Sequence, residues 1–261
     1  MRFIDLIRID GEHSEDANGQ QLRAEDVYRA DPLRESEWWS PSRRGEWVAE
    51  RYERIVLRLL RDDIFPTISG RALRSALLRR TVTIMPWPER RRGSYQAQAL
   101  PVGSTLLSCP AGEHPYRRDG TQSPLVCLGG GTAVTVKFTP AHFGPPRSGP
   151  RGRDAVLFHE LVHAVRYMDG KFQAHPAYSR ERYTNVEEFY AVVVTNVYLS
   201  ERGAPLRWGH RDSTTLLTNP DTWLNHERNR NLVARFQREQ ALFAVGLARS
   251  PASFNPFRQL S

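Results

Sequence analysis

The chain has 261 residues and a formal net charge of +8, from 37 lysines and arginines against 29 aspartates and glutamates. This length can bury a substantial core as one large domain or a compact pair, and the composition is that of a globular protein. No apolar run is long enough to span a bilayer, and charged residues interrupt the N-terminus, so we expect neither a transmembrane helix nor a Sec-type signal peptide.

The positive charge comes almost entirely from arginine, since Lys137 and Lys171 are the only lysines. The densest basic run, Arg90–Arg92, lies in a proline-flanked segment that predicts a solvated loop. No zinc finger, RNA-binding signature or alternation of aromatic and basic residues accompanies it, so the sequence disfavours nucleic-acid binding. A basic surface could equally favour acidic protein substrates or anionic membrane surfaces.

We expect an irregular, polar leader over residues 1–40 and a single domain over residues 41–261. Within the domain, apolar spacing predicts an amphipathic helix from Arg44 to Arg61 and a second helix from about Gly70 to Arg80. The segment Thr81–Met85 predicts a strand.

A loop-rich stretch follows, in which Cys109 and Cys127 could form one disulfide or remain reduced. The next segment, Thr132–Thr139, alternates apolar with small or polar residues and predicts a strand with one buried face. Such a strand could lie at the sheet edge beside the following helix and pair with an extended substrate, or it could be an ordinary sheet strand.

The segment Phe158–Arg166 is the most informative part of the chain. It places His159 and His163 four residues apart, with Glu160 directly after the first histidine. On an α-helix, positions four apart lie on one face, so both imidazoles can bind one Zn²⁺ ion. Glu160 lies about 100° around the helix from His159, where it can reach a metal-activated water as general base.

The residues around this motif predict one amphipathic helix. Asp154 can cap its start, Leu157, Leu161 and Val165 lie on its apolar stripe, and Gly170 can end it. A closed structural zinc site is disfavoured, because such sites prefer thiolates and neither cysteine lies near the motif. The other alternative is that these polar residues merely decorate a half-buried helix.

A second buried helix is expected from Val186 to Leu199, and its start supplies candidates for a third metal ligand. Thr184 or Asn185 can cap this helix. Thr184 and Glu187 have capping-box spacing, which would turn Glu187 back toward the helix start and leave Glu188 free to point at the metal. We therefore favour Glu188 over Glu187; both could instead be first-turn acids that the helix dipole favours.

Together, His159–Val165, a Gly-containing connection and Thr184–Ala191 resemble the metalloprotease domain of anthrax lethal factor and its relatives. They are also similar to bacterial effector zinc proteases whose pattern ends in a Glu-Glu pair. The resemblance covers about residues 130–200. It implies a gluzincin-type peptidase in which His159, His163 and Glu188 match the metal ligands and Glu160 matches the general base.

A residue that stabilises the transition state is also expected. Lethal factor has a tyrosine shortly before its glutamate helix that assists the transition state; Tyr178 and Tyr183 lie nearby here, but neither falls at the matching spacing. His210 follows the glutamate helix, and the returning chain could bring it to the cleft as a hydrogen-bond donor.

These patterns predict an α+β, zincin-like fold in which a small sheet packs on the His-Glu-x-x-His helix and the glutamate helix follows, with a further helix over Asn229–Leu247. The expected function is a zinc-dependent endopeptidase that acts on a protein or peptide substrate. The resemblance suggests a bacterial effector or toxin that is secreted without a Sec signal peptide, with secretion machinery or an immunity protein as partners. The alternatives are a cytosolic regulatory metallopeptidase and a non-catalytic binding protein on a zincin scaffold.

Overall fold

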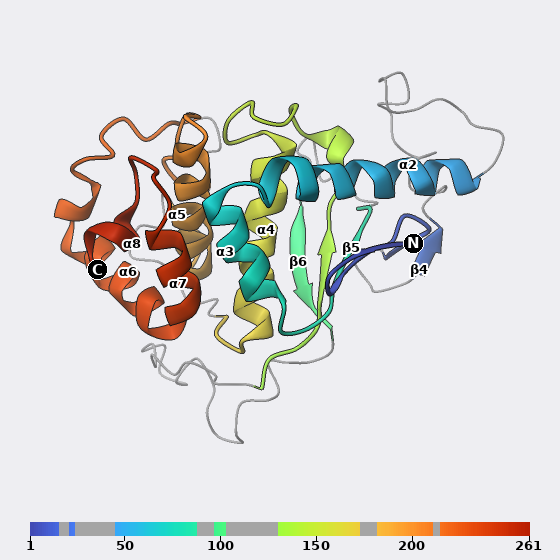
Figure 1. Cartoon of the computed structure of the whole chain (residues 1–261), viewed down its shortest axis with the longest axis horizontal. Helices are drawn as coiled ribbons and strands as arrows, with labels where there is room; N and C mark the ends of the chain where they lie inside the picture. The colour runs from blue at the N-terminus through green and yellow to red at the C-terminus, as the bar shows by residue number, and fades with distance from the viewer. Residues whose placement is uncertain (16–20, 24–44, 88–96, 103–129, 173–181, 211–214) are drawn as a thin grey trace.

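The computed structural model describes residues 1–15, 21–23, 45–87, 97–102, 130–172, 182–210 and 215–261. Arg90–Arg92, Cys109, Cys127 and Tyr178 lie outside these residues, so the expectations for them stay predictions. The described part of the chain is mixed α and β, which confirms the predicted α+β class (Figure 1). In chain order its elements are β1 (Arg2–Ile4), β2 (Ile7–Ile9), β3 (His13–Glu15), β4 (Gln21–Arg23), α2 (Gly45–Arg58), η1 (Leu59–Ile64), α3 (Ile68–Leu77), β5 (Val82–Met85), β6 (Gln98–Pro101), β7 (Val134–Lys137), η3 (Pro140–His142), α4 (Arg153–Met168), α5 (Val186–Glu201), η4 (Trp223–Asn225), α6 (Glu227–Glu239), α7 (Ala241–Ala248) and α8 (Pro256–Gln259).

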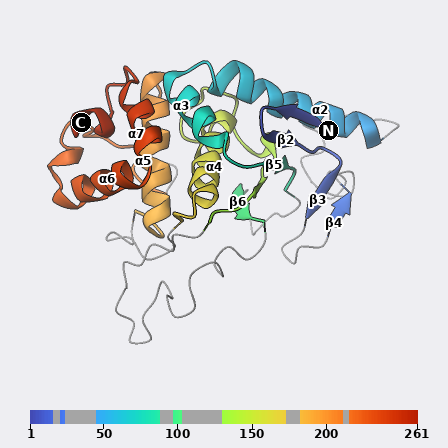
Figure 2. The same cartoon turned by 60° about the horizontal axis from the view of Figure 1, so that its bottom comes forward.

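The main sheet has the strand order β1-β2-β5-β7-β6. Its three inner strands run parallel, with Ile9 opposite Ile84 and Ile84 opposite Val136, whereas β1 and β6 run antiparallel to their neighbours. Ile9, Ile84 and Val136 are fully buried, as expected for parallel strands that are covered on both faces. A separate hairpin of β3 and β4 lies at the end of the molecule opposite the C-terminal helices (Figure 2).

The segment Thr132–Thr139 forms β7, but it is not the edge strand that the sequence allowed. β7 lies between β5 and β6, and all four of its residues are buried. The edge strand beside the metal-motif helix is β6, which comes earlier in the chain. It runs antiparallel to β7, with Ala99 opposite Val136. Four residues with one central alanine carry too weak a periodicity for the sequence to indicate this strand.

The expectation of an irregular leader over residues 1–40 is wrong for the first ten residues and for the β3–β4 hairpin, His13–Glu15 and Gln21–Arg23. Arg2–Ile9 forms β1 and β2, and Ile7 and Ile9 enter the core of the main sheet. Charged residues interrupt this segment in the sequence. Alternation explains the difference, because Arg8 lies on the opposite side of the strand from the two isoleucines and pairs with Asp10.

Two helical predictions need revision in length. The helix expected to end at Arg61 continues without a break into the π-helical segment η1 as far as Ile64. The helix expected over Asn229–Leu247 is two helices, α6 and α7, because Gln240 adopts φ −130° and ψ 46°. The turn lets α7 pack on α3 while α6 packs near α5 and α8.

Helix α4 is the centre of the fold. It packs against α5 and α3 on one side and against β6 and β7 on the other, and Figure 1 shows it between the sheet and the C-terminal helices α5 to α8. All of its residues from Leu157 to Arg166 are buried. In the described part of the chain, no helix is long and apolar enough to cross a membrane.

Candidate metal centre

Helix α4 carries the His-Glu-x-x-His motif, and its two ends differ in how well the sequence predicted them. Its N-cap is Gly152, without a side-chain cap, so the predicted cap at Asp154 is wrong. The Asp154 carboxylate instead accepts hydrogen bonds from the Tyr198 hydroxyl at 2.8 Å and the Arg147 N–H at 3.0 Å. Gly170 follows the helix with φ 62°, a left-handed conformation that favours glycine, which agrees with the predicted stop.

His159 and His163 lie one turn apart on the face of α4 that meets α5. Their Nε2 atoms are 3.2 Å apart, and their rings are nearly perpendicular, with centroids separated by 4.9 Å. Both residues are buried. Two imidazole nitrogens directed at one point inside a protein can share a single cation, as the sequence spacing predicted.

The start of α5 brings Glu188 to the histidines. Asn185 is the N-cap, and its side chain accepts a hydrogen bond from the Glu188 N–H at 2.9 Å. The capping-box role expected for Glu187 is wrong, because the Glu187 carboxylate forms a buried ion pair with Arg166, at 2.8 Å from Nη2. Glu188 is therefore the first-turn acid that faces the histidines, as predicted. The ion pair with Arg166, not a capping box with Thr184, holds Glu187 away from them.

The distances among the three groups match those between ligands of one small ion. Glu188 Oε2 lies 3.1 Å from His159 Nε2 and 3.4 Å from His163 Nε2. In a tetrahedral zinc site with bonds of about 2.0–2.2 Å, two ligand atoms are about 3.3–3.6 Å apart. The two imidazoles and the carboxylate thus fit a zinc ion both in donor chemistry and in spacing.

His210 also reaches this cluster, and Tyr183 lies buried nearby. His210 Nε2 lies 3.3 Å from Glu188 Oε2, and its ring stacks on that of His159 with centroids 5.8 Å apart. Its Nδ1 lies 3.3 Å from the Thr184 hydroxyl. Tyr183 is only 1% exposed, packs edge-on against Phe189 and interacts electrostatically with Arg207.

The loop that carries His210 is fixed from two sides. The Asn196 side chain of α5 donates to the Arg207 carbonyl and accepts from the Arg207 N–H, both at 2.8 Å. The His210 N–H donates to the Arg182 carbonyl at 2.7 Å. Gly209 makes this close approach possible, because a Cβ there would lie 2.7 Å from the same carbonyl oxygen.

The charges of the histidines and Glu188 shift one another's pKa values. Burial raises the pKa of Glu188, but the charge of His163 together with the hydrogen bonds to His159 and His163 holds the pKa well below its usual value. Burial opposes protonation of His163, yet the Glu188 carboxylate raises the pKa of that imidazole to about 9, while burial lowers the pKa of His159 to about 3. The negative charge of Glu188 thus favours a positive charge at this cluster.

Glu160 lies beside this cluster, on the side of the sheet edge. Its Oε2 accepts a hydrogen bond from the Ala99 N–H of β6 at 2.9 Å. Burial raises the pKa of Glu160 to about 7, although the charges of His163 and Arg207 lower it. A buried carboxyl group whose pKa lies near neutrality is suited to accept and return a proton.

Sequence reasoning missed two buried arginines at this centre. Arg166 follows His159 and His163 at seven and three residues, which places it on the same helix face, so the spacing could have indicated it. Arg207 is 8% exposed, and its Nε atom has no hydrogen-bond partner in the described chain. Nothing in its surrounding sequence distinguishes it from a surface arginine.

His159, Glu188 and His210 thus form a possible metal-binding group, with ligand atoms all within 4.8 Å of one another, and His163 adjoins it. If all four side chains bind the ion, a tetrahedral site is closed; if only three bind it, one position stays open for water. No protein-family model matches the sequence, and no curated protein matches it at a significant level.

Proposed function

We propose that this protein is a zinc-dependent endopeptidase of the gluzincin type, with a zincin-like fold. The observation that carries the proposal is the position of Glu160. It lies next to a cluster of two imidazoles and a carboxylate whose spacing suits zinc, and its carboxylate is hydrogen-bonded to the edge strand β6. A merely structural metal site does not require a buried carboxyl group with a pKa near 7 beside it.

In this proposal His159, His163 and Glu188 hold the ion. Zinc, when bound, polarises a peptide carbonyl and makes a water molecule more acidic. Glu160 takes a proton from the attacking water through its Oε1 atom and then returns it to the leaving amine. The hydrogen bond from Ala99 to Oε2 fixes the carboxylate in the orientation that this transfer needs.

The remaining side chains at the centre have supporting roles. His210 donates a hydrogen bond to the oxygen that becomes negatively charged, because it is the one histidine of the cluster whose side chain is substantially exposed, at 36%. Arg207 keeps a permanent positive charge near Glu160 and Glu188 and favours their ionised forms.

An extended substrate is expected to lie along β6. In an antiparallel ladder a residue directs its N–H and its carbonyl to the same side. The Ala99 N–H faces Glu160 rather than β7, so the Ala99 carbonyl also points away from β7, where a substrate N–H can meet it. This arrangement would place a scissile bond close to the metal cluster and to Glu160.

The wider biological assignment rests on the resemblance to lethal factor and the effector proteases. It favours a secreted bacterial effector or toxin; a cytosolic regulatory peptidase would use the same chemistry. The non-catalytic alternative has one specific observation in its favour, because His210 lies close enough to Glu188 to serve as a fourth ligand and close the site. The role of His210 therefore separates an enzyme from a binding protein.

The test compares the wild-type protein with Glu160→Gln, which keeps the size and polarity of the side chain but removes the base. Zinc content is measured together with cleavage of casein as an unstructured substrate. We expect one zinc per chain in both proteins and a loss of about 10²–10⁴-fold in cleavage rate in the variant, the usual contribution of a general base. Zinc-loaded wild type with unchanged cleavage in Glu160→Gln would contradict the role of Glu160, and wild type without zinc would contradict the metal site.

A further inference from the structure

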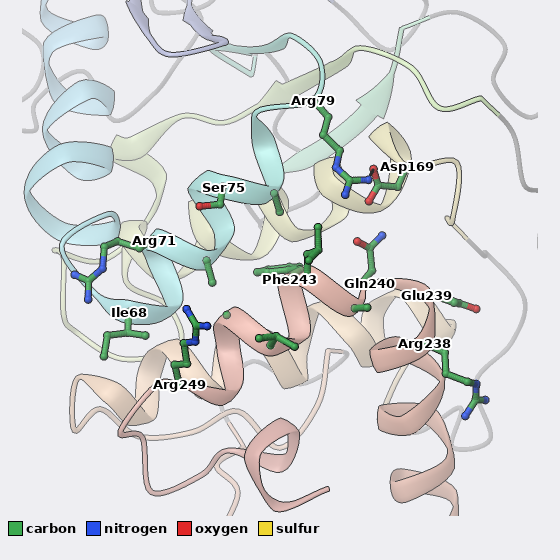
Figure 3. Close-up of a pocket in the computed structure, with 16 residues that line it drawn as sticks. Ile68, Arg71, Ser75, Arg79, Asp169, Arg238, Glu239, Gln240, Phe243 and Arg249 are labelled. Carbon is green, nitrogen blue, oxygen red and sulfur yellow. Dashed lines mark hydrogen bonds and ion pairs between the residues drawn. The ribbon is translucent and has the colours of Figure 1, made fainter. Parts of the chain in front are cut away.

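A groove between α3 and α7 contains none of the four residues of the metal cluster. It has a volume of about 770 Å³ and is closed at one end by the last turn of α6 and the end of α4 (Figure 3). Ala72, Ser75, Phe243 and Gly246 line it from the two long sides. This volume falls within the range of specific binding sites rather than that of chance surface dimples.

The groove is hollow because two small residues face each other on its floor. A Cβ atom at Gly246 would lie 2.7 Å from the Ala72 Cβ, so α3 and α7 approach closely there without filling the space above. Phe243 adds an apolar wall that is itself 3% exposed. Beside the groove, Leu242 is 79% and Val245 is 54% exposed on α7, which extends the apolar surface outward.

Arginines stand at both ends of the groove. Figure 3 shows Arg71 and Arg249 near one end, and Arg79 and Arg238 toward the other. Arg79 pairs with Asp169 at 2.8 Å. Within the described residues, Arg71, Arg238 and Arg249 form no ion pair, so the positive charge at both ends exceeds the negative charge that could balance it.

A buried polar group adds a second indication that the groove takes a ligand. Gln240 is 5% exposed and lines the groove, and its Nε2 atom has no hydrogen-bond partner in the described chain. A buried amide without a partner is costly, so native proteins usually satisfy it with another group or with water. An acceptor on a ligand in the groove would supply the missing hydrogen bond.

We infer that this groove binds an acidic amphipathic segment of a protein partner, which goes beyond the proposed peptidase activity. Helix α7 has eight residues and is about 12 Å long, so the arginines at its two ends fit carboxylates that are about two helical turns apart. A single phosphate would engage only one end. A membrane surface suits a flat or convex apolar face better than a concave one with charges at both ends.

The occupant is defined by this chemistry. It carries acidic residues at both ends of about two helical turns, with leucine-sized side chains between them that cover Phe243 and the exposed Leu242 and Val245. The carboxylates pair with Arg71 and Arg249 at one end and with Arg238 at the other. Charge attraction then sets the orientation, and the apolar contacts supply most of the affinity.

The test uses a fluorescein-labelled peptide of about 16 residues with capped ends, in which glutamate pairs flank two turns of leucine and alanine. Binding to the full-length protein is followed by fluorescence anisotropy. We expect saturable binding that weakens about tenfold or more in Arg71→Glu/Arg249→Glu, because two attractive contacts become repulsive. Leu242→Ser/Val245→Ser should weaken it by about fivefold through lost apolar contact.

The matched control is Arg54→Glu/Arg58→Glu, which makes the same charge change at two exposed arginines on α2. It should leave binding within about twofold of wild type, apart from the general effect of net charge. Equal weakening by both double variants would overturn the proposal in favour of general attraction to a basic protein. No saturable binding would overturn it, and so would binding only to vesicles of phosphatidylglycerol and phosphatidylcholine. Circular dichroism confirms that each variant is folded.

Discussion

Both ends of the α4–α5 pair contain buried polar side chains, but the protein satisfies their hydrogen bonds to different degrees. Where α4 begins and α5 ends, Asp154 accepts from Tyr198, and Arg202 donates to the Tyr198 hydroxyl at 2.7 Å. Where α5 begins, beside the middle of α4, the ligand atoms of His159, His163 and Glu188 lie within 3.4 Å of one another. At the first end, which we call the structural end, the protein itself satisfies the polar groups. The second end, which we call the metal end, contains the possible metal-binding group.

The Nδ1 atoms strengthen this contrast. At the metal end, the buried Nδ1 atoms of His159 and His163 have no hydrogen-bond partner in the described chain. At the structural end, both oxygens of Asp154 accept hydrogen bonds. Buried polar groups that stay unsatisfied cost stability and persist where function requires them. The comparison therefore separates a cluster whose polar groups the protein satisfies itself from a possible metal-binding cluster in which some stay unsatisfied.

The largest effect on stability is expected from Glu187→Ala at the metal end. Arg166 and Glu187 are both fully buried, and removal of Glu187 leaves Arg166 with the Glu239 carboxylate, 2.7 Å from its Nη1 atom, and without its bidentate partner. We expect the free energy of unfolding in urea to fall by about 3–5 kcal/mol. Because Glu187 precedes Glu188 directly, zinc affinity of the folded protein should fall as well.

A matched control at the structural end is Arg202→Gln, which breaks contacts of a side chain that is 9% exposed. It should lower stability but leave zinc affinity unchanged, because none of its partners touches the metal cluster. If zinc affinity fell equally in both variants, the Arg166–Glu187 pair would have no specific role in placing Glu188.

The next largest effect is expected from His210→Phe, which keeps an aromatic ring that can stack on His159. If His210 stabilises the transition state, cleavage should fall by about 10²–10³-fold while zinc content stays at one per chain. Metal analysis and casein cleavage measure the two quantities on the same sample. Loss of zinc in this variant would instead make His210 a ligand and support a closed, non-catalytic site.

At the structural end, Tyr198→Phe should have a smaller effect. It removes one hydrogen bond to the Asp154 carboxylate and one from Arg202 within the core. A hydrogen bond to a charged group contributes about 1.5–3 kcal/mol, so thermal and urea unfolding should show a loss of that order. Zinc binding and cleavage at low temperature should match the wild type; a change in either would show that the two ends are coupled.

The last effect is a dependence of zinc affinity on pH. Glu188 raises the pKa of His163 to about 9, so this imidazole is protonated in the metal-free protein at neutral pH. Zinc binds the neutral form, so binding must release that proton, and affinity should rise about tenfold per unit from about pH 6 to about pH 8. Calorimetry in two buffers of different ionisation enthalpy counts the released protons. A pH-independent affinity would contradict the coupling between His163 and Glu188.

The sequence predicted local features of the metal end well. The four-residue spacing of His159 and His163 is a property of one helix, and the structure places their Nε2 atoms together as expected. The favoured position of Glu188 beside them also agrees with the structure, but the reason given for it was wrong. A capping box is a local pattern, whereas the partner of Glu187 is Arg166 on another helix, which no local rule could identify.

The features that the sequence missed depend on contacts between distant segments. The edge strand β6 is too short to show a periodicity, and its position follows from pairing with β7. Arg207 is held in its buried position by two hydrogen bonds between its backbone and the Asn196 side chain. In the sequence, Asn196 does not differ from other polar residues on a helix. The strands at the N-terminus were missed because three-residue segments with charges carry little signal until Ile7 and Ile9 meet a sheet.

The most direct test of the central claim is equilibrium zinc binding by metal-stripped protein, compared between the two ends of the α4–α5 pair. We expect wild type to bind one zinc, Glu188→Gln to bind it at least about 100-fold more weakly, and Asp154→Asn to bind it like wild type despite lower stability. The account would be contradicted if wild type bound no zinc, or if Glu188→Gln bound it as tightly as wild type.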